Sequence, residues 1–178
     1  MVTPRLETLC TALAQVLIAR KLSMATAESC TGGLIAASCT QLSGSSAWFE
    51  RGFVTYSNAA KSELLGVPGS LIEAQGAVSE EVAKAMALGA LAHSPAHISV
   101  AVTGIAGPTG GTDAKPVGTV WLAWAWRDSK QVLHSETLLR QFEGTRSEVR
   151  DATAELALAH LTELVGKLLE TTGKKIPT

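Results

Sequence analysis

The sequence predicts an α/β fold: a single three-layer α/β/α sandwich with a mixed, mostly parallel sheet. Its first half alternates helical and strand patterns, which is typical of parallel strands joined by helical crossovers. Two adjacent strand patterns, 117–126 and 131–142, indicate an antiparallel hairpin that makes the sheet mixed. The first of these is apolar on both alternating faces, as expected of a strand covered on both sides. One face carries Val120, Leu122, Trp124 and Trp126, and the other Trp121, Ala123 and Ala125.

In chain order, the first expected element is an amphipathic helix over 4–21, whose apolar residues recur at helical spacing. A short apolar strand follows at 24–29. The residues of 31–33 then form a glycine turn, which opens a second helix that runs to about residue 41. Aromatic and β-branched residues predict a strand at 48–57.

Asn58 is placed to cap a short helix that ends near the glycines and proline of 66–69. Another helix begins at Ser79, with two acids in the first turn, where the helix dipole favours them. An apolar strand at 97–103 precedes a stretch, 104–118, that holds five glycines and two prolines.

Thr145 and Glu148 have the spacing of a capping box, which predicts the start of a long final helix that ends near residue 170. We expect one domain over 1–170 and a frayed polar tail over 171–178.

Composition excludes several classes of protein. The chain has 178 residues, a formal net charge of −1 and 46% hydrophobic residues, so it can bury a core without a metal or disulfide staple. The weak charge argues against nucleic acid or an anionic membrane as a partner. No convincing signal peptide or long apolar run is found. Three cysteines and four histidines lack disulfide or metal-ligand spacing, which predicts a reducing cytoplasm and no metal.

Two short motifs could carry nucleophilic chemistry. At Ser29 and Cys30 a strand runs through a glycine turn into a helix N-terminus, where unpaired backbone N–H groups can hold a phosphate or an oxyanion. Lys61 would lie in the first turn of the helix capped by Asn58, where the helix dipole and any burial lower a lysine pKa, as a general base requires. Tyr56, the only tyrosine of the chain, ends the preceding strand and could lie on the same side.

Two further motifs could bind a ligand. The glycine-rich stretch 103–111 follows an apolar strand, and ligands of α/β proteins bind at strand carboxyl ends. It is neither a P-loop nor a dinucleotide fingerprint. Arg146 lies in the first turn of the last helix, where backbone N–H groups could share a phosphate with it. Each of the four motifs could also be purely structural.

Together the motifs, spread over about residues 5–170, resemble the CinA C-terminal domain family. The segments that carry the resemblance are Ala27-Glu28-Ser29-Cys30-Thr31-Gly32-Gly33, Tyr56-Ser57-Asn58-Ala59-Ala60-Lys61, Gly76-Ala77-Val78-Ser79, Thr103-Gly104-Ile105-Ala106-Gly107-Pro108, Lys115-Pro116-Val117-Gly118, and Phe142-x-Gly144-x-Arg146-x-x-Val149-Arg150.

The resemblance implies an amidohydrolase that converts nicotinamide mononucleotide to nicotinate mononucleotide and ammonia, without metal or cofactor. It implies Ser29, Tyr56 and Lys61 as the catalytic set, and a homo-oligomer. We expect Ser29 to attack the amide and Lys61 to accept its proton, directly or through Tyr56. The expected oxyanion- and substrate-binding residues are Cys30, Thr31, Gly32, Gly33, Thr103, Gly104, Gly107, Arg146 and Arg150.

Two alternatives stay open at this point. Cys30 could be the nucleophile, because a thiol at a helix N-terminus can have a lowered pKa. The domain could also be a nucleotide-binding module without turnover, because the same glycine loops and helix N-terminus would hold a phosphate equally well.

Overall fold

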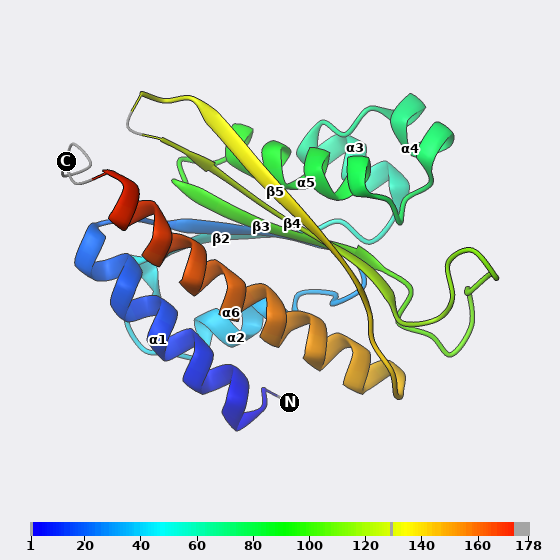
Figure 1. Ribbon diagram of the computed structural model, residues 1–178, viewed down its shortest axis with the longest axis horizontal. Helices are drawn as coiled ribbons and strands as arrows, with labels where there is room; N and C mark the ends of the chain where they lie inside the picture. The colour runs from blue at the N-terminus through cyan, green and yellow to red at the C-terminus, as the bar shows by residue number, and fades with distance from the viewer. Residues whose placement is uncertain (1, 129, 173–178) are drawn as a thin grey trace.

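The computed structural model describes residues 2–128 and 130–172 and shows an α/β fold with a five-stranded sheet (Figure 1). The sheet has the order β2-β1-β3-β4-β5. Its strands are β1 (Met24–Glu28), β2 (Phe49–Val54), β3 (Ile98–Gly104), β4 (Thr119–Arg127) and β5 (Leu133–Gln141). β1 pairs in parallel with β2 and β3, whereas β3–β4 and β4–β5 are antiparallel. The sheet is therefore mixed, as predicted, but its pairings are divided equally and it is not mostly parallel.

Helices lie on both faces of the sheet (Figure 1). One face is covered by α1 (Pro4–Arg20), α2 (Leu34–Thr40) and α6 (Arg146–Thr172). The other is covered by α3 (Asn58–Leu65), α4 (Gly69–Gln75) and α5 (Glu80–Ala92). A 3₁₀ turn, Ser45–Ala47, precedes β2. The short helix α4 was not predicted from the sequence.

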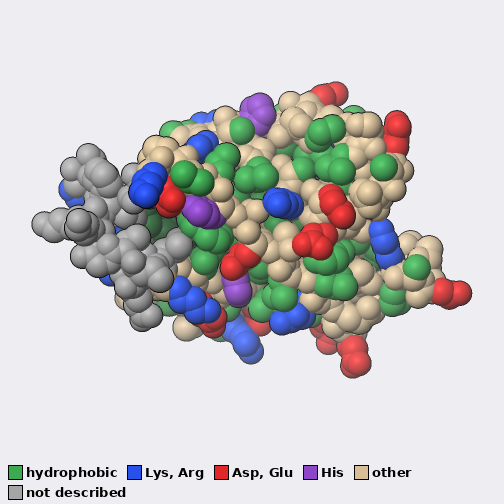
Figure 2. Space-filling view, turned by 45° about the horizontal axis from the view of Figure 1, so that its top comes forward, with side chains coloured by type: hydrophobic (Ala, Val, Ile, Leu, Met, Phe, Trp, Pro, Cys, Tyr) green, Lys and Arg blue, Asp and Glu red, His purple; other side chains and the backbone are tan. Residues whose placement is uncertain are grey.

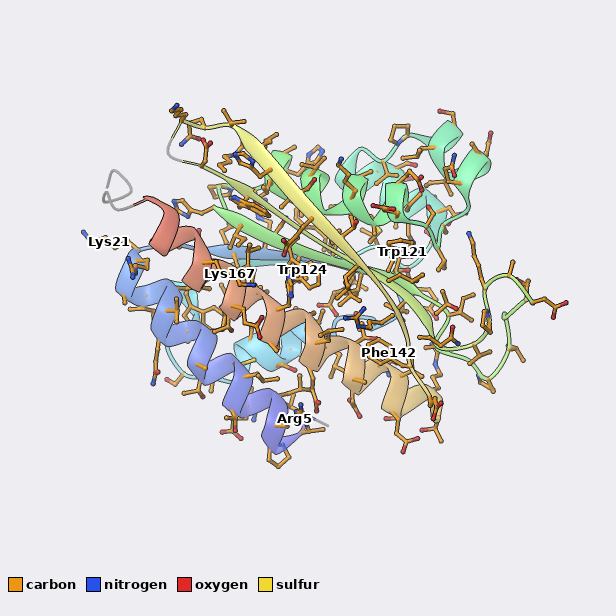
Figure 3. All side chains as sticks on the ribbon, in the orientation of Figure 1. Arg5, Lys21, Trp121, Trp124, Phe142 and Lys167 are labelled. Carbon is orange, nitrogen blue, oxygen red and sulfur yellow. The ribbon has the colours of Figure 1, made fainter. Side chains whose placement is uncertain are left out.

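The two faces of the sheet bury side chains of different size. Towards α1 and α6 the strands present large residues, and Trp124 donates its indole N–H to the Ala157 carbonyl of α6 (Figure 3). Towards α5 they present alanines, and the hydroxyl of Ser99 on β3 donates to the Ala87 carbonyl at 2.7 Å. The prediction that β4 is apolar on both faces is confirmed: Val120, Leu122, Trp124 and Trp126 belong to the first cluster, and Trp121, Ala123 and Ala125 to the second.

Capping residues define where several helices begin. The Thr3 hydroxyl caps α1 and Pro4 stands in its first turn. The predicted capping box of α6 is present, because the Glu148 carboxylate accepts from both the N–H and the hydroxyl of Thr145. Ser57 caps α3 by accepting from Ala60 N–H, so the prediction that Asn58 is the cap is wrong by one residue.

The surface carries no strong charge of one sign on the face drawn in Figure 2, where basic and acidic side chains alternate with apolar ones. Within residues 2–128 and 130–172, no helix is both long and apolar enough to cross a membrane. The expected tail falls partly on α6, which extends to Thr172, and residues 173–178 lie outside the described part of the chain.

Candidate active site

Ser29 follows the last residue of β1, a central strand, and begins the turn that leads into α2. Its N–H donates to the Val102 carbonyl of β3, and its carbonyl accepts from Gly32 N–H. Gly32 and Gly33 have φ values of 58° and 93°, in the left-handed region that glycine adopts without strain. The turn therefore fixes Ser29 at the carboxyl end of the strand, with its side chain 8% exposed.

Glu28, which sequence reasoning did not assign a role, occupies the N-terminus of α2. Its fully buried carboxylate accepts from the backbone N–H groups of Ile35 (3.0 Å) and Ala36 (2.8 Å). It also accepts from the hydroxyls of Thr31 (2.7 Å) and Thr26 (3.3 Å). A carboxylate is stabilised there by the helix dipole. These N–H groups are thus not free to bind a phosphate or an oxyanion. The sequence signal for this role of Glu28 was an acidic residue at the end of a mostly apolar strand, just before a helix.

Lys61 brings its amine from α3 to the Ser29 hydroxyl. The Nζ–Oγ distance is 3.1 Å, and Nζ also lies 2.9 Å from the Thr55 carbonyl and 3.4 Å from the Tyr56 carbonyl. The side chain is buried, which lowers the pKa of Lys61 from its ordinary value of 10.5; the smaller effect of Cys30 acts in the opposite sense. With Ser57 as the cap, Lys61 is the fourth residue of α3, not the third. Burial accounts for the lowered pKa.

Tyr56 lies beside Ser29 and Lys61, but its phenol contacts neither of them. The residue is 59% exposed, and its phenol oxygen accepts from Nη2 of Arg146 at 3.0 Å. Its contact with Lys61 is made by the backbone carbonyl. The structure therefore joins Ser29 directly to Lys61 and joins the Tyr56 phenol to Arg146.

The three residues face a cavity of about 200 Å³. The predicted residues Cys30, Thr103, Gly104 and Arg146 line it as well. Sequence reasoning gave no site role to four further lining residues, namely Asn58, Ala77, Val78 and Ala106. Each of the four belongs to a motif that carried the family resemblance, which was the signal that could have found them.

The other predicted binding residues are not among those that line the cavity. The Arg150 guanidinium holds the Thr31 carbonyl, with Nη2 at 2.7 Å. The Gly107 carbonyl accepts from Nη1 of Arg146 at 2.9 Å. Thr31, Gly32 and Gly33 form the turn beneath Ser29.

Cys30 lines the cavity, but burial raises its pKa from 9.0 to about 11. A thiol with a raised pKa is a poor source of thiolate at neutral pH. Among the residues that the structure describes, no group of three or more His, Cys, Asp or Glu side chains is arranged to hold a metal ion.

The fold and the site together define a class: an α/β protein in which a serine at the end of a central strand contacts a buried lysine. Residues 6–165 match the family described as CinA C-terminal domain. The chain therefore belongs to the CinA C-terminal domain family, as its motifs predicted.

Two proteins with similar sequences carry the same name. A Pseudomonas putida protein named nicotinamide-nucleotide amidohydrolase PncC is 52% identical over 159 residues, which cover 89% of this chain and 96% of that protein. An Escherichia coli K12 protein of the same name is 48% identical over 147 residues, covering 83% and 87% of the two chains.

Solved structures share the fold. The competence/damage inducible protein CihA of Agrobacterium tumefaciens has a TM-score of 0.84 at 43% identity, covering 94% of this chain and 98% of that one. A CinA superfamily protein of Klebsiella pneumoniae has a TM-score of 0.85 at 38% identity, covering 91% and 98%.

Proposed function

We propose that this protein hydrolyses the carboxamide of nicotinamide mononucleotide to give nicotinate mononucleotide and ammonia, with Ser29 as nucleophile and Lys61 as base. The names of relatives at about 50% identity support the substrate. The observation that carries the chemistry is the 3.1 Å contact between the Ser29 hydroxyl and the buried Lys61 amine.

The surroundings of Lys61 suit a neutral amine. A neutral amine has two N–H donors and one lone pair. The carbonyls of Thr55 and Tyr56 can accept the two N–H groups, which leaves the lone pair for the Ser29 hydroxyl. Burial favours the same form by lowering the lysine pKa. Lys61 can then take the serine proton directly, without the Tyr56 phenol.

In the first half of the reaction, Ser29 Oγ forms a bond to the amide carbon while its proton passes to Lys61. The oxyanion needs N–H donors that are not already used. Gly32 N–H bonds to the Ser29 carbonyl, and Glu28 takes those of Ile35 and Ala36. We therefore assign the oxyanion to the N–H group of Cys30, the residue of this turn after Ser29 that lines the cavity.

In the second half, the carbon–nitrogen bond breaks and Lys61 returns the proton to the leaving amide nitrogen, which departs as ammonia. Water then attacks the acyl-enzyme, giving its proton to Lys61, and Lys61 reprotonates Ser29. This sequence ends with the starting enzyme, the acid and ammonia.

The substrate phosphate needs a cation at the cavity. We assign it to Arg146, which lines the cavity and keeps N–H groups beyond the two bonded to Gly107 and Tyr56. Arg150 is engaged with the Thr31 carbonyl, so we do not assign the phosphate to it.

The test is simultaneous measurement of ammonia and nicotinate mononucleotide from wild type, Ser29→Ala, Lys61→Met and the control Lys84→Met, which changes an exposed lysine on α5. We expect losses of about a thousandfold or more for the first two variants and none for the control. Wild-type turnover in Ser29→Ala would refute the nucleophile. If Cys30→Ser were inactive and Ser29→Ala active, the nucleophile would be the Cys30 thiol. If calorimetry showed that wild type binds the mononucleotide and no ammonia were released, the protein would be a nucleotide-binding module without turnover.

A further inference from the structure

We propose that Lys115 is a positioning residue, which fixes the cavity wall formed by Ala77 and Val78 by holding the backbone of the segment between α4 and α5. The inference rests on the proposed function, because its consequence is read in the amidase reaction. Lys115 belongs to a motif that carried the family resemblance but has no place in the mechanism above.

The segment 75–78 has an irregular backbone whose carbonyls are held by side chains. Lys115 Nζ donates to the carbonyls of Val78 (2.7 Å) and Gln75 (3.2 Å). The Thr103 hydroxyl donates to the Ala77 carbonyl at 2.8 Å. The Ser79 hydroxyl donates to the Gly76 carbonyl at 2.9 Å. Lys115 thus donates two of these four hydrogen bonds to the segment. Its amine is a charged donor, so these two bonds are the stronger ones.

The Lys115 ammonium lies beside Gly76, whose backbone conformation favours glycine. Gly76 has a φ of 79°, and a Cβ at this position would lie 3.4 Å from Lys115 Nζ. Gln75 ends α4, so the cation also lies at a helix C-terminus, where the dipole favours positive charge. Both features favour Lys115 as a built-in anchor.

Lys115 comes from the loop between β3 and β4, which extends beyond the sheet (Figure 1). At the base, Gly118 N–H donates to the Ile105 carbonyl at 2.7 Å. Further out, Lys115 and Thr112 close a turn through two backbone hydrogen bonds. The loop therefore presents the amine from a defined turn, and the amine connects this loop to the cavity wall.

The first experiment compares wild type, Lys115→Met and the control Lys84→Met in the ammonia assay. We expect Lys115→Met to lower kcat by about tenfold or more with a smaller change in KM, because substrate still binds but the wall no longer aligns it. A rise in KM at unchanged kcat would instead make Lys115 a phosphate contact and overturn the proposal.

A second measurement needs no substrate. Hydrogen–deuterium exchange of the ligand-free proteins should show faster exchange in peptides that cover 76–79 for Lys115→Met, and wild-type exchange for Lys84→Met. Unchanged exchange would overturn the proposal. If wild type releases no ammonia, the proposed function fails, while this measurement still decides whether Lys115 holds the wall.

Restoring the ammonium separates its role from a folding defect. In Lys115→Cys, alkylation with 2-bromoethylamine forms a carbon–sulfur bond, releases bromide and recreates an amine at lysine length. The three native thiols are buried, which limits the access of the reagent to them. We expect alkylation to return at least half of the lost kcat and the slow exchange of 76–79. A folded, alkylated protein that recovers neither would refute the role of the ammonium.

Discussion

Replacing Glu28 by glutamine should cost this protein a large part of its stability. The carboxylate oxygens share four donors: Oε1 accepts from Thr26 and Ala36, and Oε2 from Thr31 and Ile35. A glutamine turns one oxygen into an NH₂ group. The threonine hydroxyl on that side can rotate to accept from it, but the backbone N–H cannot. Either orientation therefore leaves one buried N–H of α2 facing another donor.

The magnitude follows from what is lost. A hydrogen bond to a charged group contributes about 1.5–3 kcal/mol, and the negative charge at the helix N-terminus about 0.3–1 kcal/mol. We expect Glu28→Gln to lower the free energy of unfolding by about 2–4 kcal/mol. With an m-value of about 2 kcal/mol/M, the urea midpoint falls by about 1–2 M.

Urea unfolding at pH 7.5, followed by tryptophan fluorescence and circular dichroism, measures this change. The matched control is Glu7→Gln, which removes an exposed acid from the first turn of α1 and should shift the midpoint little. A midpoint shift for Glu28→Gln as small as that of the control would refute the reasoning, since it would mean that the carboxylate charge and its second oxygen stabilise nothing.

The remaining predictions concern the reaction and its pH dependence. Because kcat/KM requires neutral Lys61, it should rise with pH and level off at a pKa below 10.5; a falling profile in that range would contradict the base role. The difference in the free energy of unfolding between Lys61→Met and wild type should shift in favour of wild type as the pH rises from 7 to 10, because the lowered pKa means that protonated Lys61 destabilises the folded state; chemical denaturation across pH measures this. Tyr56→Phe should lose less than about a hundredfold in kcat, far less than Ser29→Ala, because the phenol contacts Arg146 and not the dyad. Arg150→Met should lower kcat more than it raises KM, since the guanidinium supports the Thr31 carbonyl; a pure KM effect would make it a phosphate ligand.

The proximity of Ser29 and Lys61 was predictable because each follows a strand in the sequence pattern. Ser29 follows β1 and Lys61 lies just past the end of β2, and these strands are parallel neighbours, so their carboxyl ends meet at one edge. The 3.1 Å contact itself could not be predicted, because it depends on the depth at which α3 packs.

Three other features of the fold were not predicted from the sequence. Ser57 and Asn58 are both good caps, and only the backbone shows which hydroxyl or amide is used. Helix α4 is seven residues long and begins at a glycine after a proline, so its sequence resembles a turn. The equal division of the sheet between parallel and antiparallel pairs was also missed. The hairpin of β4 and β5 adds two antiparallel pairings, because β4 pairs with β3 as well as with β5, and the crossovers add only two parallel ones.

The alanine-rich face of the sheet connects the core of the protein to the wall of the cavity. Towards α5, β3 presents the small residues Ser99 and Ala101, and the N-terminal end of α5 continues into Val78 of the cavity wall. A larger residue at Ala101 or Ala123 would push α5 outward and carry that wall with it. Substitutions in the middle of the sheet can therefore change the width of the cavity, and they also act on the position of Lys61, because α3 packs closely against α5 where Leu65 meets Gly89.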